Sequence, residues 1–406
     1  MSKLFYQDTI EGIKVNYDNL LNDLSSVSSY NKYCKASSYY DVFKHIIISM
    51  ILGEEIILLD HDFTSNEIEK LIGDSNLIFN EKPINAIGKI SFKGILEKIK
   101  LNKNSWKINL FSSGTTGLPK KISHTFDSLT RFIKIERKRK NNTWGFAYNP
   151  THMAGLQVFF QAFLNENSIV RLFGLEKNIV LNLINKYEVT NISATPTFYR
   201  MLISPVYVSD KVANLTSGGE KFDSKTIQDL KVMFPKSQIR NVYASTEAGA
   251  LFSSKGNDFT IKSDFLDLFK IINNELLIHS SLLGKSDSIK LVNGWYQTGD
   301  IIEIINEKPL RFRFLSRKNE VINTGGYKVN PNEVEHSLRQ IEGILDAFVF
   351  GKKNSLLGNI VSCEIICNQL FTRCCILGKT LLFLLLCLHF LIFLFRLLPF
   401  PLSVIS

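Results

Sequence analysis

The chain has 406 residues, of which 45% are hydrophobic and 21% charged, and its formal net charge is +10. This composition is ordinary for a globular protein and excludes a disordered or fibrous chain, and the length predicts two or more domains. The positive charge is spread along the sequence, which suits small anionic ligands.

The densest basic run, residues 134–140, has five basic residues without aromatic residues between them. Such a run is typical of a solvated helix end, and a nucleic-acid site is the weaker alternative. Only Cys34 of the six cysteines precedes Cys363, and the first sixteen residues contain no apolar secretory segment. We therefore expect a cytoplasmic protein with no disulfide framework and no nucleic-acid partner.

Hydrophobic periodicity predicts helices alternating with strands as far as residue 243. The expected helices cover 42–52, 65–72, 126–138, 155–164, 179–187 and 223–234, with a further helix opening at 198. The expected strands cover 55–59, 77–79, 144–148, 168–173, 189–194, 212–216 and 239–243. This alternation predicts an α/β fold in which a large N-terminal domain contains doubly wound sheets.

The pattern changes after residue 258. Short strands are expected at 259–261, 276–279, 294–297 and 301–305, separated by turns. They predict a small antiparallel β subdomain within the large domain.

The segment from Asn109 to His124 contains an apolar run, then Ser, Thr and Gly residues, then Lys120. Glycines allow consecutive backbone N–H groups to surround an anion, while hydroxyl groups and a lysine add donors and charge. A polyphosphate is the natural ligand, and a solvated turn is the alternative. The segment is not a Walker A loop, because Leu118 and Pro119 separate the last glycine from the lysine. The candidate ligand-binding residues are Ser112, Ser113, Gly114, Thr115, Thr116, Gly117 and Lys120.

The whole segment resembles the phosphate loop of the adenylate-forming (AMP-binding) superfamily, and the chain is most similar to its acyl-CoA synthetase or acyl-acid ligase type. Further stretches follow in the order of that family. Gly218, Gly219 and Glu220 resemble its Gly-Gly-Glu turn, whose glycines let the backbone lie against adenine and the acyl group.

Residues 241–249 resemble the family pattern Tyr-Gly-x-Thr-Glu-x-Gly, with Ala244 in place of the first glycine and Asn241 just before it. The resemblance implies that Tyr243 stacks near adenine. It also implies that Thr246 bonds the α-phosphate and that Glu247 helps to hold Mg²⁺, since a carboxylate facing a triphosphate needs a cation between them. A surface loop after a buried strand is the alternative.

Residues 295–300 resemble the pattern Tyr-x-Thr-Gly-Asp, in which Asp300 would accept hydrogen bonds from both ribose hydroxyls. A simple β-turn residue is the alternative for Asp300. Arg317 resembles the family residue that takes the ribose or phosphate charge. Asn319 stands at the hinge, where the family usually has Asp or Lys, which changes the hinge chemistry without forbidding rotation. Gly325 and Gly326 lie where relatives let the pantetheine thiol approach.

Residues 150–155 match the region with which the family lines its acyl pocket. His152 is interpreted as a gate for the carboxylate, with a capping or packing role as an equal alternative. No aspartate occurs from 148 to 162, which favours a carboxylic acid without an α-amine. Three nearby residues would form either an apolar pocket wall or part of the core, namely Phe159, Phe160 and Phe163.

The resemblance runs from about residue 107 to 366, and beyond Asn368 the chain becomes rich in Cys, Leu and Phe. The family's catalytic lysine is expected near the end of the chain. The only Gly-Lys pair there, Gly378-Lys379, comes too early and precedes an apolar run instead of a basic one, so the pattern favours loss of that lysine. A coding disruption is the favoured explanation for this change of composition after Asn368. The alternative is a membrane anchor, although the apolar run is shorter than the roughly 20 residues that a membrane span needs. The expected domains are a large domain (1–315), a partial, incomplete small α+β C-terminal hinge domain (316–368) and a tail outside the family (369–406).

The resemblance implies an enzyme that uses ATP and Mg²⁺ to convert a small carboxylic acid into an acyl-adenylate with release of pyrophosphate. Transfer to CoA, or to the pantetheine of an acyl carrier protein, would follow. The residues expected to take part in the chemistry are Thr246, Glu247, His152 and Arg317. One alternative is a nucleotide-binding remnant without the catalytic lysine, and a weaker one is a protein tethered to a membrane by its tail.

Overall fold

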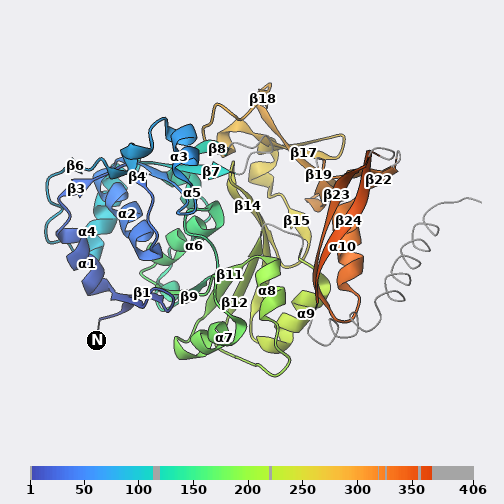
Figure 1. Cartoon of the computed structure of the whole chain (residues 1–406), viewed down its shortest axis with the longest axis horizontal. Helices are drawn as coiled ribbons and strands as arrows, with labels where there is room; N and C mark the ends of the chain where they lie inside the picture. Colours follow the sequence, from blue (N-terminus) through green and yellow to red (C-terminus); the bar gives the residue numbers. More distant parts are fainter. Residues whose placement is uncertain are drawn as a thin grey trace, which may run out of the picture. The chain divides into compact units, whose positions relative to one another are not determined.

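The computed structural model describes residues 2–112, 119–218, 222–318, 320–324, 327–354 and 358–367. The chain divides into two compact units, with the boundary between Asn319 and Glu320 (Figure 1). Each unit has its own sheets and its own buried residues. In the described part of the chain, no helix has both the length and the apolar character needed to cross a membrane.

The largest sheet of the first unit has eight strands in the order β14-β13-β12-β11-β9-β10-β1-β2. The inner pairs are parallel, while the edge strands β14 and β2 are antiparallel to their neighbours. The strands are β1 (Leu4–Asp8), β2 (Ile13–Asn16), β9 (Thr143–Phe146), β10 (Ser168–Arg171), β11 (Asn191–Ala194), β12 (Asn214–Gly218), β13 (Gln238–Ser245) and β14 (Gly249–Ser254). Its connecting helices are α6 (Met153–Phe163), α7 (Lys177–Lys186), α8 (Pro196–Leu202) and α9 (Ser224–Met233).

A second sheet of the first unit has the order β4-β5-β7-β8. Its strands are β4 (Tyr33–Cys34), β5 (Glu55–Leu58), β7 (Lys107–Ser112) and β8 (Lys120–Thr125), and β3 (Ser29–Tyr30) pairs separately with β6 (Lys82–Pro83). The accompanying helices are α1 (Tyr17–Ser25), α2 (Tyr39–Leu52), α3 (Ser65–Ile72), α4 (Phe92–Asn102) and α5 (Phe126–Thr130). Helix α3 opens with a capping box formed by Thr64 and Glu67.

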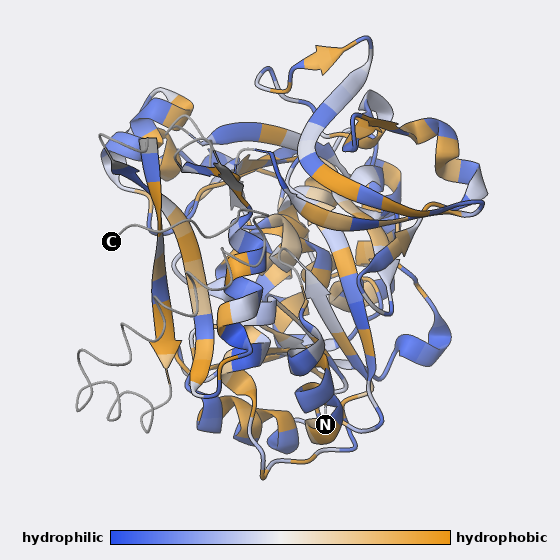
Figure 2. Cartoon of the chain, turned by 90° about the vertical axis from the view of Figure 1, so that its right-hand side faces the viewer, coloured by the Kyte–Doolittle hydropathy of each residue, from blue (hydrophilic) through white to orange (hydrophobic). Residues whose placement is uncertain are grey.

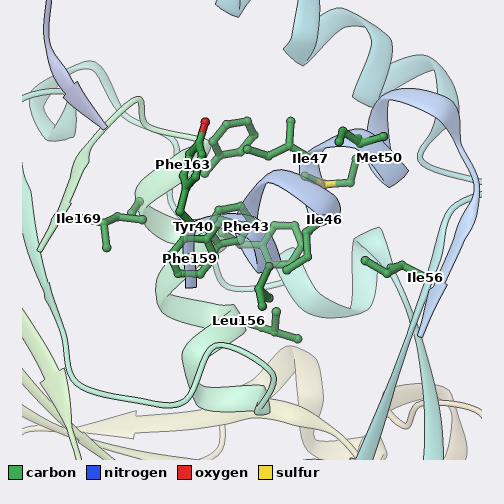
Figure 3. Packing of buried hydrophobic residues seen from close by; sticks show 14 of the residues in the cluster. Tyr40, Phe43, Ile46, Ile47, Met50, Ile56, Leu156, Phe159, Phe163 and Ile169 are labelled. Carbon is green, nitrogen blue, oxygen red and sulfur yellow. The ribbon is translucent and has the colours of Figure 1, made fainter. Parts of the chain in front are cut away.

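Aromatic side chains of α2 and α6 form the centre of the largest buried cluster (Figure 3). Phe43 stacks on Phe159 with ring centroids 4.7 Å apart, and Phe159 stacks on Phe163 at 5.5 Å. These rings and Phe160 are fully buried, and burying each one stabilises the fold by roughly 1.5–3 kcal/mol. The phenylalanines of α6 are therefore core residues, not the wall of a pocket.

The third sheet of the first unit is antiparallel, with the order β15-β20-β19-β17-β16 and with β18 paired to β19. Its strands are β15 (Asp258–Thr260), β16 (Phe269–Ile272), β17 (Glu275–His279), β18 (Leu291–Val292), β19 (Trp295–Glu307) and β20 (Leu310–Arg317). This sheet confirms the expected antiparallel subdomain, and together with the two α/β sheets it confirms the predicted fold class.

The second unit is a four-stranded antiparallel sheet with one helix. Its elements are β21 (Ile322–Thr324), β22 (Tyr327–Val329), α10 (Pro331–Arg339), β23 (Ile344–Asn354) and β24 (Gly358–Cys367). Arg339 of α10 makes an ion pair with Asp346 of β23 at 3.1 Å. Orange and blue segments of the ribbon alternate along strands and helices in Figure 2, as expected for elements with one buried and one exposed face.

Three corrections to the predicted elements are needed, and together they concern four elements. Residues 75–79 form a 3₁₀ helix (η1, Ser75–Phe79) in place of a strand, because the side chain of Asp74 accepts the amide of Asn76 at 2.8 Å. The predicted strands 294–297 and 301–305 form one strand, β19, in which Gly299 adopts a φ of +75° and the register shifts after Ile301. The remaining short 3₁₀ helices are η2 (Arg137–Arg139), η3 (Ser263–Leu268) and η4 (Ser280–Leu282).

The helix predicted over 126–138 is the third of these corrections, because α5 already ends at Thr130. Two side chains in and just after α6 form hydrogen bonds with the backbone of the segment that follows α5. The amide groups of Gln161 and Asn165 each donate to the carbonyl of Lys134 at 3.1 Å, and Asn165 Oδ1 accepts the amide of Glu136 at 3.1 Å. These tertiary hydrogen bonds replace the intrahelical ones that the periodicity predicts.

Candidate active site

The β7–β8 hairpin carries the ends of the predicted phosphate loop. Ser112 at the end of β7 lies opposite Lys120 at the start of β8 in the antiparallel register. Ser112 and Lys120, the described residues nearest to the loop in β7 and β8, are therefore neighbours across the hairpin. Several predicted residues lie outside the described part of the chain, namely Ser113, Gly114, Thr115, Thr116, Gly117, Gly219, Glu220, Asn319, Gly325, Gly326 and Lys379.

A tight turn between β13 and β14 carries Thr246 and Glu247, both of which are half-buried. The turn closes because Gly249 adopts a φ of +69°, a conformation that favours glycine, and because the side chain of Ser245 accepts the amide of Ala248 at 3.1 Å. The sequence therefore places a hydroxyl and a carboxylate side by side at the end of two strands.

The next predicted group joins this hairpin to the antiparallel subdomain. The hydroxyl of Tyr243 in β13 donates to Asp300 Oδ2, and the guanidinium Nε of Arg317 donates to Asp300 Oδ1 at 2.9 Å. Asp300 is only 5% exposed, whereas the Arg317 side chain is 56% exposed. The ring of Tyr243 stacks on Phe314 with centroids 4.3 Å apart. The structure thus brings together three of the predicted site residues from two sheets.

Two tyrosines of this region are held in the neutral form. Burial, and then the charge of Asp300, raise the pKa of Tyr243 well above its ordinary value. Burial, and then the charges of Glu247 and Asp300, raise the pKa of Tyr296 to about 12. Both hydroxyls therefore keep their protons at neutral pH, and the hydroxyl of Tyr243 uses its proton in the hydrogen bond to Asp300.

His152 stands at the N-terminus of α6, where its side chain makes no capping hydrogen bond. Its Nε2 lies 3.2 Å from Oδ2 of Asp60, a residue that follows β5. The same oxygen accepts a hydrogen bond from the side-chain amide of Asn149 at 2.8 Å. Because a carboxylate only accepts, the imidazole donates from Nε2. The hydrogen bond from His152 is the main reason why the pKa of Asp60 falls to about 2. The described geometry therefore favours a role other than helix capping for His152.

Close packing places the start of α6 against the β13–β14 turn. A Cβ atom built on Gly249 would lie 3.1 Å from Gln157 Nε2 and 3.8 Å from the sulfur of Met153. A Cβ atom on Gly155, in the first turn of α6, would meet the carbonyl oxygen of Asn149 at 2.2 Å, so glycine is required at this position.

The three remaining described candidates lie in the neighbouring parallel strands β12 and β13. Gly218 ends β12 beside Val242 of β13, whose carbonyl oxygen would lie 3.1 Å from a Cβ atom at this glycine. Asn241 is buried in β13 and its side-chain amide approaches Asn257 Oδ1 at 3.4 Å. Ala244 follows Tyr243 in β13 and pairs with Ala250 of β14.

Two residues of the site were not identified from the sequence. His124 of β8 contacts the backbone of Thr246 through its Nε2, at 2.8 Å from the carbonyl oxygen. Asp60 contacts His152 across 92 residues of sequence. The sequence signal for His124 was its alternation with Ile122, which puts both side chains on the buried face of β8. Asp60 has no such local signal, because its partners Asn149 and His152 are distant in the chain.

An α/β unit with these motifs at the ends of its strands defines the adenylate-forming class of proteins. The chain belongs to the family whose model is described as AMP-binding enzyme, which matches residues 43–265, more than half of its length.

Similar proteins agree with this membership. A 2-succinylbenzoate–CoA ligase of Staphylococcus epidermidis is 24% identical over 297 residues, which cover 66% of this chain and 61% of the relative. The chain therefore spans about three fifths of the length of such curated relatives. The solved o-succinylbenzoate coenzyme A synthetase of Bacillus subtilis, in complex with ATP and magnesium ion, has a TM-score of 0.64 at 18% identity, covering 92% of this chain and 90% of the other. ATP-bound MatB from Rhodopseudomonas palustris has a TM-score of 0.63 at 16% identity, covering 90% and 86%. These structural likenesses concern the fold.

Proposed function

We propose that this protein uses ATP to activate a carboxylic acid as an acyl-adenylate, with release of pyrophosphate, and then transfers the acyl group to the thiol of CoA or of a carrier pantetheine. The observation that carries the proposal is the group of Tyr243, Asp300 and Arg317 beside the Thr246–Glu247 turn. Family membership and the relatives that are CoA ligases support the same reaction class.

The nucleotide would be held by polar groups with different tasks. Asp300 keeps unused lone pairs on both oxygens, because a carboxylate has about four acceptor positions and two are taken by Tyr243 and Arg317. It would accept the ribose hydroxyls. Arg317 is exposed enough to meet a phosphate as well, and Lys120 would carry a charge toward the β- and γ-phosphates.

Glu247 fits a role in holding Mg²⁺. It is half-buried at the turn, and its carboxylate oxygens are the ligand type that a hard cation such as Mg²⁺ prefers. Such a cation would neutralise phosphate charge while the nucleotide is bound. The hydroxyl of Thr246 would donate to an oxygen of the α-phosphate.

The reaction itself needs positioning more than a protein nucleophile. A carboxylate oxygen of the acid attacks the α-phosphorus, the new O–P bond forms, and the bond from that phosphorus to the β-phosphate oxygen breaks. Both the attacking and the leaving group are anions, so no proton has to move. The imidazole of His152, fixed by Asp60, would border the acid and orient its carboxylate.

The substrate is proposed to be an acid without an α-amine, because residues 148–162 contain no aspartate to bind an ammonium group. Phe159, Phe160 and Phe163 do not shape its pocket, since all three are buried in the core.

The test is pyrophosphate release by the full chain with ATP, Mg²⁺ and a panel of short, medium and aromatic acids, with and without CoA. Release that depends on both ATP and one class of acid would support the proposal. Binding of ATP or AMP without turnover of any acid would contradict it and favour the nucleotide-binding remnant.

A further inference from the structure

His124 is a buried histidine that the proposed mechanism does not use. It lies in β8, six residues before the end of α5, and is 1% exposed. Its Nε2 lies 2.8 Å from the carbonyl oxygen of Thr246, across 122 residues of sequence, and its Nδ1 faces the hydroxyl of Ser128 at 3.3 Å.

The chemistry of the contact fixes which nitrogen carries the proton. Burial, opposed by the hydrogen bond to Thr246 and reinforced by the charge of Arg131, lowers the pKa of His124 below its ordinary value. The ring is therefore neutral at pH 7 and has one N–H group. A carbonyl oxygen only accepts, so that hydrogen lies on Nε2 and is donated to Thr246.

A second contact holds the next carbonyl of the same turn. The amide of Gly284 donates to the carbonyl oxygen of Glu247 at 2.7 Å. Its neighbour Lys285 exchanges two backbone hydrogen bonds with Ser123, the residue before His124, each at 2.8 Å. Two consecutive carbonyls of the turn are thus held from β8 and from the segment that pairs with β8.

Gly284 also packs directly against the imidazole. A Cβ atom at this position would lie 2.7 Å from His124 Cε1 and 2.7 Å from Ile122 Cγ2. Such distances are sterically forbidden, so the absence of a side chain at Gly284 lets the ring reach Thr246.

We propose that His124 is a positioning residue that couples the β7–β8 hairpin to the Thr246–Glu247 turn. The coupling keeps the hydroxyl of Thr246 and the carboxylate of Glu247 in place relative to the strand that starts with Lys120. The role of this turn toward MgATP rests on the proposed function, whereas the mechanical coupling is a property of the described contacts.

The experiment compares the full-length protein with His124→Leu and His124→Gln. Leucine fills much of the space but removes the donor, while glutamine keeps an amide N–H able to reach a carbonyl. His45 provides the matched control, since its Nε2 also contacts a backbone carbonyl, that of Asn31, far from the turn. His45→Leu is therefore measured alongside. The two readouts are hydrogen–deuterium exchange of the peptide covering residues 244–250 and the gain in ATP affinity caused by Mg²⁺.

We expect His124→Leu to increase exchange in residues 244–250 and to reduce the Mg²⁺-dependent gain in ATP affinity about tenfold, the usual result of leaving a buried acceptor without its donor. Glutamine should restore most of both, and His45→Leu should change neither. Unchanged exchange in His124→Leu, or an equal increase in His45→Leu, would overturn the inference.

The exchange readout also separates this inference from the proposed function. If the wild-type protein bound no ATP and released no pyrophosphate, the proposed function would fail. A selective increase of exchange in the turn would still support the coupling by His124, and its absence would still refute it.

Discussion

The hydroxyl of Tyr243 in β13 donates a hydrogen bond to Asp300 in β19, 57 residues further along the chain. This contact joins the large parallel sheet to the antiparallel subdomain within the first unit. Arg317 of β20 completes the group by donating to the other oxygen of Asp300 at 2.9 Å. The carboxylate is thereby fixed in one orientation while its remaining lone pairs stay available.

Replacing Asp300 with alanine should raise the KM for ATP by about tenfold or more, because hydrogen bonds to a charged group are worth roughly 1.5–3 kcal/mol. Steady-state kinetics at saturating acid would measure this. Asp258→Ala is the matched control, since Asp258 pairs with Arg313 in the same sheet at 2.7 Å and should leave the KM for ATP unchanged. Equal effects of both substitutions would mean that Asp300 is structural.

Lys120→Ala should weaken ATP use far more than binding of the acid, because the lysine would supply charge for the phosphates and not for the substrate's acyl portion. Lys121→Ala is the control, since Lys121 is an exposed lysine next to Lys120 on the same strand. It tests whether the effect is specific to the position of Lys120. The KM values for ATP and for the acid, measured for both variants, decide the matter. Losses of similar size for ATP and acid in Lys120→Ala would argue against a phosphate-binding role.

The sequence predicted the parallel α/β core well because the apolar runs of its strands are local signals. It failed where long-range contacts override the local pattern. The segment after Thr130 is helical in periodicity, but Gln161 and Asn165 take its backbone hydrogen bonds. Likewise, one positive-φ glycine, Gly299, keeps β19 continuous across a sequence that looks like a turn.

Motif and position placed Tyr243, Asp300 and Arg317 in one predicted site, and hydrogen bonds join these three residues in the structure. Their roles toward a nucleotide stay predictions. Two contacts that orient the site, Tyr243 to Asp300 and His124 to Thr246, were not predictable, because they join residues that are 57 and 122 positions apart. The N-terminal strands β1 and β2 were also missed. Their short apolar runs become strands only because β1 pairs with β10, more than 150 residues away.

Gly155→Ala should destabilise the first unit by roughly 1–3 kcal/mol, because the added Cβ atom would stand 2.2 Å from the carbonyl oxygen of Asn149. Movement of Asn149 would also disturb Asp60, to which its side chain donates at 2.8 Å. Gly256→Ala is the control, since a Cβ atom there has no neighbour within 4 Å among the described residues. Denaturant unfolding of both variants would measure the difference, and equal stabilities would contradict this account of the turn before α6.

Asp60→Asn should alter both acid stability and the use of the carboxylic acid. The hydrogen bond from His152 lowers the pKa of Asp60 from 3.8 to about 2 in the folded protein. A carboxyl group with a lowered pKa in the folded state stabilises the fold fully above the unfolded value, and this stabilisation is lost as the pH falls toward the folded value. The difference in the free energy of unfolding between the wild-type protein and Asp60→Asn should therefore shrink as the pH falls from about 4 to about 2.

The size of that difference should be modest, at most about 1 kcal/mol, because the His152 side chain is 61% exposed and solvent screens the pair. Unfolding by acid, followed by circular dichroism, would measure it, with Asp62→Asn as the exposed neighbouring control. In kinetics, Asp60→Asn should raise the KM for the acid more than that for ATP, because only the acid would border His152. A larger change for ATP, or a stability difference independent of pH below 4, would show that Asp60 does not act through His152.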